Sequence, residues 1–457
     1  SIIQTIVIVG IFMSVLDSVV VNIALPEITN HFNVDVAYSQ WVITTYPLVE
    51  TALLIVFGKI AERTGKASMF TAGLGVFTVA SLLCGLSSSL EELIVFRIIQ
   101  GIGASMLFSI SIAITFEVSR AEKRGKVMGM VGGVVAVASM VGPPMGGFIV
   151  GYLGWQYIFF VNVPIGLMAT IAALYFMKLS DKNAEKKRFD VIGAVLWTMA
   201  VSALLLMIGQ VAETGDFDVL ALIWTAISIS SFIAFIIRER RVPDPLLDLS
   251  VFKVSKFTLA CGSAALFFIT VTMVNFLSPF YFEGVMGYSA QQVGIILMII
   301  PTVLLFGSPY VGRLVDRTHW PHYPTVGMMM RGVSLVALAY AFYWSDIYIA
   351  AVSLVFIGAS GSLFQPPNNL QAMTVLAKEK TSTASSVLAT ARNLGISLGS
   401  AFGAMLLVLQ LGTSSITGSV DTSALATATA VALVVAAIIS FIGAITSHIG
   451  RADDHRP

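Results

Sequence analysis

The sequence predicts an all-α integral membrane protein with 14 transmembrane helices, arranged as two six-helix bundles with two extra helices between them. Three observations support this fold class: the composition, a series of long apolar runs, and the sign of the charges between those runs. Of the 457 residues, 57% are hydrophobic and only 11% are charged. Soluble domains carry about 25% charged residues, so this chain has too few to cover a surface that faces water.

The apolar runs set the number of predicted helices. A helix needs about 20 apolar residues to cross the hydrocarbon core of a bilayer. Between breaks that carry charges, Gly or Pro, the chain has fourteen such runs, over residues 3–31, 38–61, 68–87, 92–117, 126–151, 155–177, 190–212, 219–237, 257–281, 290–312, 325–344, 347–376, 384–411 and 424–449. The first run lacks a basic segment before it and a clear cleavage site, so we expect a retained helix rather than a signal peptide.

The charges between the runs alternate in sign. Alternate connections are basic, with Arg63 and Lys66, then Arg120, Lys123, Arg124 and Lys126, then 178–188, 238–256, Arg313 and Arg317, Lys378 and Lys380, and Arg451 and Arg456. The remaining connections have no Lys or Arg and carry Asp35, Glu91, Glu213, Asp216, Asp218, Glu283, Asp346 and Asp421. Basic connections stay in the cytoplasm. The pattern therefore supports the helix count, and it predicts a multi-pass membrane protein with both termini cytoplasmic.

Several function classes find no support in the sequence. The net charge of +1 gives no case for a nucleic-acid partner. Cys84 and Cys261 each lie alone in an apolar run, and the five histidines have no ligand spacing, so we expect no metal site. The chain shows no nucleotide-binding glycine loop and no Ser/His/Asp set, which argues against an enzyme. We expect no cofactor, an ion gradient as energy source, and a monomer in contact with membrane lipid.

An internal repeat predicts two related halves. Gly58-Lys-Ile-Ala-Glu-Arg-Thr-Gly65 matches Gly312-Arg-Leu-Val-Asp-Arg-Thr-His319, and Ile102-Gly-Ala-Ser105 recurs as Ile357-Gly-Ala-Ser360 at nearly the same offset. Chance matching of short strings is the alternative. Parallel halves with a site near the midplane between them are a transporter architecture. The predicted domains are 1–178, 179–256 with the two inserted helices and a connector, and 257–457.

The connector from Arg238 to Lys256 holds two helix-breaking prolines and apolar residues among charges. We expect it to lie along the inner membrane surface as a plain connector, with a calmodulin-like or lipid-sensing role as the alternative.

Asp17 places a carboxylate about halfway along the first apolar run. A charge there costs about 2.5–3.5 kcal/mol on insertion scales, so such a residue usually faces a polar interior and marks a path for protons or substrate. Arg97 lies within the fourth run and needs a partner, which Asp17 would supply and Gln100 could bridge. The alternative is that Arg97 snorkels outward from near its helix start.

Glu50 lies in the middle of the second run and is the other acidic residue that we place near the bilayer midplane. Our hypothesis is that Asp17, Glu50 or both are protonated when substrate leaves and ionised when a cationic substrate binds. A hydrogen bond to a neighbouring helix is the alternative role for Glu50.

Arg392 lies beside Asn393 without an acidic partner in its own run, so it either pairs with a carboxylate across the bundle or binds an anionic group. We expect Arg331 to snorkel and Glu117 to be an exposed carboxylate at a helix end. The candidate substrate-binding residues are Asp17, Glu50, Tyr46, Asn275, Phe280, Tyr281, Gln365, Asn368, Asn369, Gln371 and Arg392.

Three segments resemble motifs of the major facilitator superfamily. Gly58 to Phe70 is similar to its loop between helices 2 and 3, with Glu62 where the family usually has Asp. Leu93 to Ser105 resembles its fourth-helix motif, which implies that Arg97 takes part in proton coupling. The first resemblance and its repeat imply a conformational switch formed by Gly58, Glu62, Arg63, Gly65, Lys66, Gly312, Asp316 and Arg317.

Val141-Gly-Pro-Pro-Met-Gly-Gly147 resembles the motif that separates antiporters from symporters in this superfamily. Pro143 and Pro144 lack a backbone N–H, and Gly142, Gly146 and Gly147 permit close helix contact. A kinked, tightly packed helix is expected here, with simple bending and packing as the alternative.

Leu16-Asp-Ser-Val-Val-Val-Asn-Ile-Ala-Leu-Pro26 is similar to the first helix of the fourteen-helix drug:proton antiporter family, with Ser18 in place of Thr. This resemblance implies the major facilitator fold. It also implies export of amphipathic compounds, most simply lipophilic cations, by proton antiport and alternating access. The alternative is an exporter of the same fold for an amphipathic anion, lipid or natural product that uses Arg392.

Overall fold

The structure is a computed structural model that describes residues 2–34, 36–177, 189–214, 217–377, 380–411 and 422–452. Over these ranges the chain is helical without strands, and fourteen helices are long and apolar enough to cross a membrane. The predicted fold class and helix count are therefore confirmed. The predicted domain boundary after residue 178, the basic segment 178–188, and Asp35, Asp216, Lys378, Asp421 and Arg456 lie outside the described residues.

The first half and the insert begin the chain. The elements of the first half are α1 (Ile2–Phe32), α2 (Val36–Ser39), α3 (Trp41–Thr64), α4 (Lys66–Leu86), α5 (Leu90–Glu117), η1 (Ala121–Lys123), α6 (Arg124–Leu153), α7 (Tyr157–Phe160) and α8 (Asn162–Phe176). The insert has α9 (Val191–Thr214), α10 (Val219–Glu239) and the short η2 (Leu249–Lys253).

The second half follows. It has α11 (Ser255–Gly284), α12 (Ala290–Leu297), α13 (Ile299–Thr318), α14 (Tyr323–Trp344), α15 (Ile347–Thr374), α16 (Thr381–Leu411) and α17 (Thr422–Ala452). Because successive spans run in opposite directions, the basic connections share one end of the bundle, and the connections that lack Lys and Arg share the other. We call these the basic end, which carries Arg63, Lys66, Arg124 and Arg317, and the acidic end, which carries Glu91, Asp218 and Asp346.

Two predicted spans are interrupted. The sixth is divided into α7 and α8, and the tenth into α12 and α13. In both cases a proline lies four residues after the last residue of the first piece: Pro164 after Phe160, and Pro301 after Leu297. A proline has no N–H to donate to the carbonyl four residues earlier, so the break falls where that hydrogen bond is missing.

Four of the helices that start at the acidic end are capped by side-chain oxygens. Ser89, Asp218, Ser289 and Asp346 accept hydrogen bonds from backbone N–H groups in the first turns of α5, α10, α12 and α15. Such caps satisfy amide donors that have no partner within the helix. The acidic and hydroxyl residues of these short connections therefore also fix where the helices begin.

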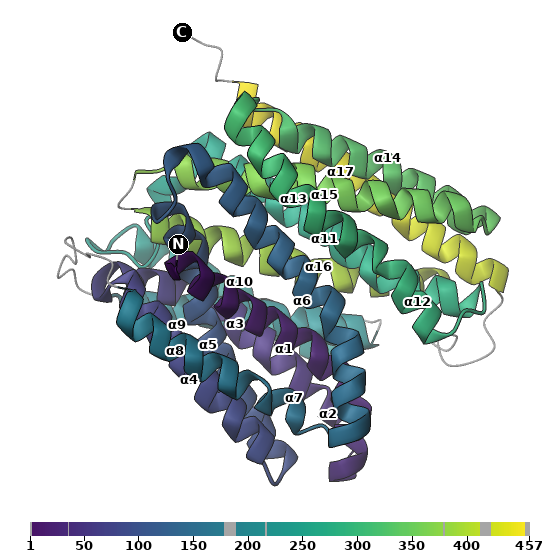
Figure 1. Ribbon diagram of the computed structural model, residues 1–457, viewed down its shortest axis with the longest axis horizontal. Helices are drawn as coiled ribbons and strands as arrows, with labels where there is room; N and C mark the ends of the chain where they lie inside the picture. Colours follow the sequence, from purple (N-terminus) through teal and green to yellow (C-terminus); the bar gives the residue numbers. More distant parts are fainter. Residues whose placement is uncertain are drawn as a thin grey trace.

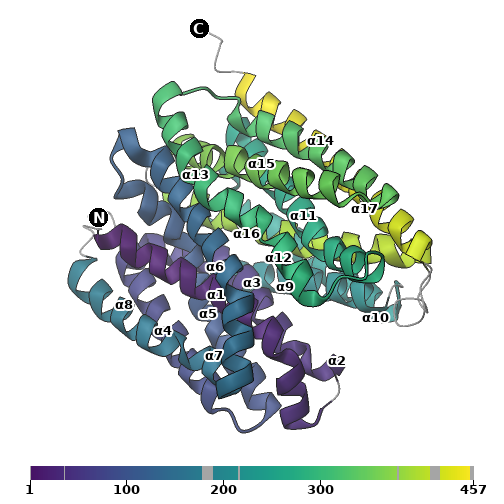
Figure 2. The same ribbon diagram turned by 45° about the vertical axis from the view of Figure 1, so that its right-hand side comes forward.

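The two halves lie side by side, as both views show (Figure 1, Figure 2). Between them α6 packs along α13, and α3 packs along α16. The inserted helix α9 contacts α3 of the first half and α16 of the second. The insert therefore covers one seam between the halves.

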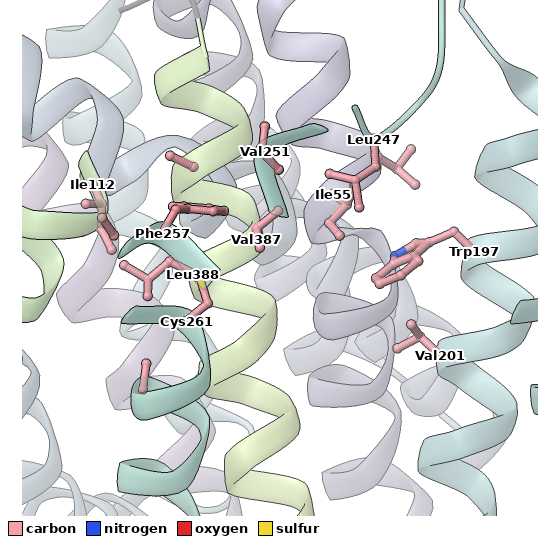
Figure 3. Packing of buried hydrophobic residues seen from close by; sticks show 14 of the residues in the cluster. Ile55, Ile112, Trp197, Val201, Leu247, Val251, Phe257, Cys261, Val387 and Leu388 are labelled. Atoms are coloured by element: carbon pink, nitrogen blue, oxygen red, sulfur yellow. The ribbon is translucent and has the colours of Figure 1, made fainter. Parts of the chain in front are cut away.

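The connector after α10 packs against the protein. Leu246, Leu247 and Val251 are buried in a hydrophobic cluster at the basic end, together with Ile55 of α3 and Val387 of α16 (Figure 3). The backbone N–H groups of Leu246 and Leu247 donate to the carboxylate of Glu239, at 3.3 and 2.8 Å. These bonds turn the chain back onto the protein.

An ion pair ties the connector to the second half. The ammonium of Lys380, just before α16, lies 2.6 Å from Oδ2 of Asp248. Partial burial raises the pKa of Asp248, but the hydrogen bonds from Lys380 and Ser250 lower it more, to about 2. The carboxylate is therefore ionised at any pH at which the protein works.

Asp248→Asn tests this link. A carboxylate with a depressed pKa stabilises the fold above its unfolded value of about 3.9 and loses that effect as the pH falls through about 2. Because both side chains are substantially exposed, we expect a loss of less than about 1 kcal/mol. The loss, measured by thermal unfolding, should be the same at pH 5 and pH 8. An effect at pH 8 that disappears at pH 5 would contradict the assignment.

Candidate functional site

A buried network surrounds Asp17 in the middle of the first half. Nη1 of Arg97 donates to Oδ2 of Asp17 at 2.5 Å, while Nε2 of Gln100 and Nδ2 of Asn162 donate to Oδ1, both at 2.9 Å. Nε of Arg97 donates to the carbonyl of Val42 at 2.9 Å. Asp17 is 2% exposed and Arg97 is 1% exposed. The predicted Asp17–Arg97 pair with Gln100 as bridge is present, and Arg97 does not snorkel.

A second layer holds this network in place. Nε2 of Gln100 also donates to Oγ of Ser81 at 2.9 Å, and Sγ of Cys84 lies 3.9 Å from Oε1 of Gln100. The guanidinium carbon of Arg97 lies 4.5 Å from the centre of the Tyr46 ring, and the hydroxyl of Tyr46 donates to a carbonyl of α1 at 3.3 Å. Each side chain therefore fixes the orientation of the next.

The network is confined to the first half, since its members come from α1, α3, α4, α5 and α8. Both carboxylate oxygens of Asp17 are bonded within it, and the side chain does not reach the second half. The structure therefore places Asp17 and Tyr46 inside the first half, away from the interface between the halves. Our sequence analysis missed Asn162 and Ser81. Asn162 was detectable as an amide inside the apolar run 155–177.

Glu50 lies between the halves instead. Its Oε1 accepts a hydrogen bond from Nδ2 of Asn393 on α16 at 2.8 Å, and the side chain is 6% exposed. Nε of Arg392 is 3.4 Å from Oδ1 of Asn393. The Arg392 guanidinium carbon lies 4.9 Å from the ring centre of Phe108 on α5 and 5.9 Å from that of Phe268 on α11. A carboxylate, an amide and a guanidinium thus follow one another across the interface.

The other predicted binding residues are dispersed. Gln365 of α15 faces α6, because a Cβ at Gly132 would lie 3.9 Å from its Oε1. Asn369 is half-buried and Asn275 is exposed. Tyr281 is instead packed inside the second half, where its ring stacks on Phe342 with centroids 3.7 Å apart. The structure therefore does not bring Tyr281 together with Glu50.

Two latches join the halves at the basic end. In the first, Glu62 of α3 accepts a hydrogen bond from the hydroxyl of Thr383 on α16. A Cβ at Gly58 would lie 2.6 Å from Cβ of Ser386, so only glycine permits this approach of α3 to α16. Lys66 pairs with Glu117 and donates to the hydroxyl of Thr381 at 2.9 Å. Glu117 is exposed as predicted, but its carboxylate also interacts with Lys66 and with the hydroxyl of Thr381.

The second latch repeats the first with the halves exchanged. The Asp316 carboxylate at the end of α13 accepts hydrogen bonds from the backbone N–H groups of Gly125 and Lys126, at 2.7 and 2.8 Å. It thereby caps the N-terminus of α6, where a negative charge is favourable. Gly312 packs against the backbone at Gly125 so closely that a Cβ would overlap it. The repeated segments therefore have equivalent contacts.

The remaining predicted switch residues adopt simpler roles. Gly65 has φ of 95° at the turn between α3 and α4, a value that side chains rarely allow. Arg63 is half-buried and Arg317 is exposed. The structure thus assigns Gly65 a backbone role and places Arg317 on the surface of the basic end.

The glycines of the predicted antiporter motif bring α6 onto α1. A Cβ at Gly142 would lie 2.7 Å from Cγ1 of Val19, and one at Gly146 would lie 3.1 Å from Cγ1 of Val20. Pro143 is exposed, and nothing lies within 4 Å of a Cβ at Gly147. Helix α6 continues through both prolines. Two glycines of the motif therefore pack on α1 near Asp17, whereas Pro143, Pro144 and Gly147 are exposed.

The prediction for Arg331 is wrong. It does not snorkel: the side chain is 2% exposed, and its Nε donates to Oγ1 of Thr270 at 2.6 Å. Its guanidinium carbon lies 4.7 Å from the ring centre of Phe267. The hydroxyl of Thr270 and the ring of Phe267, both on α11, hold Arg331 inside the bundle. The sequence does not reveal that these two side chains lie opposite Arg331.

Fourteen spans, two halves that carry equivalent latches, and a carboxylate at the interface define a membrane transporter rather than an enzyme. Residues 7–400 match the family model of the Major Facilitator Superfamily. The chain belongs to this superfamily, and the resemblance found in its motifs is confirmed.

Three known proteins illustrate the relationship. The riboflavin transporter RibZ of Clostridioides difficile (strain 630) is 33% identical over 88% of this chain and 87% of its own length. The multidrug export protein EmrB of Escherichia coli (strain K12) is 30% identical over 85% of this chain and 76% of its own length. The crystal structure of the human organic anion transporter MFSD10 superposes with a TM-score of 0.69 over 96% of this chain and 99% of its own, at 13% identity, and shows the shared fold.

The buried pair can be tested by a double-mutant cycle. Removing one partner of a buried ion pair leaves an uncompensated charge and costs about 3–5 kcal/mol. We expect Asp17→Asn and Arg97→Gln each to lower the free energy of unfolding by that amount, measured in detergent micelles. The double variant should lose clearly less than the sum of the two. Additive losses would show that the two side chains do not interact.

Gly129 tests the packing of α6 on α13. A Cβ at this position would overlap the carbonyl oxygen of Ser308, whereas a Cβ at Gly151 of the same helix meets nothing within 4 Å. We expect Gly129→Ala to lower the free energy of unfolding by about 1–3 kcal/mol through overpacking. Gly151→Ala should be neutral or stabilising by up to about 1 kcal/mol. Equal effects of the two substitutions on thermal unfolding would disprove the close approach.

Proposed function

We propose that this protein is a proton-coupled antiporter that exports amphipathic compounds, with lipophilic cations as the leading class, by alternating access. The observation that carries the proposal is the position of Glu50. Its carboxylate is buried between the halves, and the hydrogen bond from Asn393 joins the first half to the second.

The interface bond couples charge to conformation. The described contacts close the basic end, so access from that end requires α3 to leave α16. That movement breaks the bond between Glu50 and Asn393. A carboxylate that loses its donor in a low-dielectric site needs another donor, a cation or a proton. Either a cationic substrate or a proton therefore satisfies Glu50, and the two compete, which is the requirement for antiport.

The Asp17 network would transmit protonation to the second latch. A proton on Asp17 removes the negative charge that holds Arg97, so α1 and α5 readjust. Helix α1 touches α6 through Val19 and Gly142, only two residues from Asp17. Helix α6 in turn begins at the amides that Asp316 caps. We propose this continuous packed route as the link from the buried carboxylate to the basic end.

An amphipathic anion or neutral natural product is the second candidate. Arg392 lies at the interface over Phe108 and Phe268, and its guanidinium has no carboxylate among its described contacts. Two aromatic rings and a cation suit a flat, polar aromatic molecule. Relatives include a riboflavin transporter as well as a multidrug export protein, so both substrate classes occur among similar chains.

The orientation follows from the charges. We propose that the basic end faces the cytoplasm and that the protein resides in the plasma membrane, because Lys and Arg are retained on the cytoplasmic side. We further propose that it works as a monomer whose partners are its substrate and lipid, with the proton gradient as energy source.

Substrate-driven proton release from proteoliposomes tests the function. A panel of lipophilic cations and anions is applied to wild type, Glu50→Gln, Asp17→Asn and Arg392→Ala. Glu91→Gln is the control, since Glu91 is an exposed carboxylate at the acidic end. We expect release with cations, reduced at least about tenfold in Glu50→Gln and Asp17→Asn because neither amide exchanges a proton. The control should behave as wild type.

Reconstituted variants are compared at equal amounts of folded protein, because Asp17→Asn is also expected to destabilise the chain. A response to anions alone, abolished by Arg392→Ala, would favour the second candidate. Undiminished cation-driven release in both carboxylate variants would refute the proposed coupling.

A further inference from the structure

A pocket of about 400 Å³ opens at the basic end, outside the sites described above. It lies where the start of α6 meets the ends of α13 and α15 and the start of α11. Arg124 contributes from the first half, and Lys256, His319, Trp320, Gln371 and Thr374 contribute from the second. We call it the basic-end pocket. Its volume falls in the range of small-molecule sites, about 300–1,000 Å³.

The charges that line the pocket favour an anion. Arg124 and Lys256 are cations, and His319 adds a further basic group. Asp316 is the one acidic lining residue among the described ones, and its two oxygens are occupied by the backbone amides of Gly125 and Lys126. The lining is therefore net positive, with donors but no free carboxylate.

Two buried polar atoms at the pocket have no hydrogen-bond partner. They are Nε of Arg124 and Oε1 of Gln371. The guanidinium of Arg124 lies over the Phe116 ring, with 4.0 Å between its carbon and the ring centre. Gln371 is anchored at its other end, since its Nε2 donates to the carbonyl of Gly450 at 3.2 Å. A buried donor without a partner costs about 1–3 kcal/mol, so Arg124 would gain if its side chain turned this N–H from the Phe116 ring toward acceptor oxygens of a ligand in the pocket.

The rim of the pocket is amphipathic. Trp320 is 45% exposed, and Pro321 and Pro367 also line the pocket. Indole rings with one apolar and one wet edge favour the membrane–water interface. A ligand that joins an anionic head to an apolar tail would match both parts of this lining.

We propose that the basic-end pocket binds a phosphate group, carried either by an anionic phospholipid or by a soluble phosphate ester, and that the bound phosphate holds the basic end closed. Phosphate oxygens accept from guanidinium and ammonium groups in strong, charge-assisted hydrogen bonds. Because Arg124 belongs to one half and Lys256 to the other, one phosphate between them bridges the halves only while the latches are engaged. The proposal does not depend on the transported substrate.

The binding test uses the full chain in dodecyl maltoside. Dihexanoyl phosphatidylglycerol, dihexanoyl phosphatidylcholine and sn-glycerol 3-phosphate are titrated while binding is followed by calorimetry and thermal unfolding. We expect saturable binding of the phosphatidylglycerol and a higher unfolding temperature, with at least about tenfold weaker binding in Arg124→Gln and Lys256→Gln. Arg120→Gln is the matched control, because Arg120 is an exposed basic residue of the same connection that does not line the pocket.

Thr374→Trp fills the pocket without changing a charge, and it keeps the test decisive if Arg124→Gln fails to fold. It should abolish binding. Equal affinity for glycerol phosphate and phosphatidylglycerol would identify a soluble phosphate ester as the ligand, and binding of phosphatidylglycerol alone would identify a lipid headgroup. Absence of saturable binding, or an equal loss in Arg120→Gln, would overturn the proposal.

The conformational part is measured with spin labels at Lys123→Cys and Thr318→Cys, two exposed positions on opposite halves. Cys84 and Cys261 are buried, which leaves the introduced thiols as the accessible ones among the described residues. We expect the ligand to increase the fraction of short inter-label distances in wild type and not in Thr374→Trp. An unchanged distance distribution under saturating ligand would exclude a role in closure.

Discussion

A carboxyl and a guanidinium group buried within an apolar bundle both need hydrogen-bond partners, and the first half is organised by this requirement. Asp17 and Arg97 obtain their partners from neighbouring helices rather than from water. Each partner is in turn oriented by another side chain, such as Ser81 behind Gln100. Any change at Asp17 must therefore be accommodated by several helices together, and this makes the network suitable for converting a proton into a movement.

The halves meet through a different kind of contact. Each latch uses a carboxylate at the end of one helix and donors at the start of a helix in the other half: Glu62 with Thr383, and Asp316 with the amides of Gly125 and Lys126. Glycines let the backbones approach in both places. These bonds lie near the surface of the bundle, where water can replace a lost partner. They are therefore easier to open and close than the Asp17 network, which suits a gate.

The insert adds a constraint that a twelve-helix arrangement lacks. Helix α9 packs against both α3 and α16, and the apolar residues of the connector join the same cluster (Figure 3). The seam between α3 and α16 is thereby covered, whereas the seam between α6 and α13 is held by glycine packing and by the hydrogen bonds that Asp316 accepts. A separation of the halves must either carry α9 with one of them or slide both past it. The Asp248–Lys380 pair ties the connector to the start of α16.

The sequence alone determined the number of spans, their direction and the family, because apolar length, charge sign and motif spacing are local properties of the chain. The sequence also predicted the pair of Asp17 and Arg97, because each of two opposite charges in apolar runs needs a partner, and the other is the nearest candidate. The tertiary structure decided what each remaining polar residue meets. Asp17 and Glu50 belong to separate sets of contacts, and Glu50 accepts a hydrogen bond from Asn393 of the other half. Arg331 is buried and donates to Thr270, and Tyr281 packs in the core of the second half. These outcomes depend on which side of each helix faces which neighbour. Spans that are apolar all round have no amphipathic pattern that would show their inward face in the sequence.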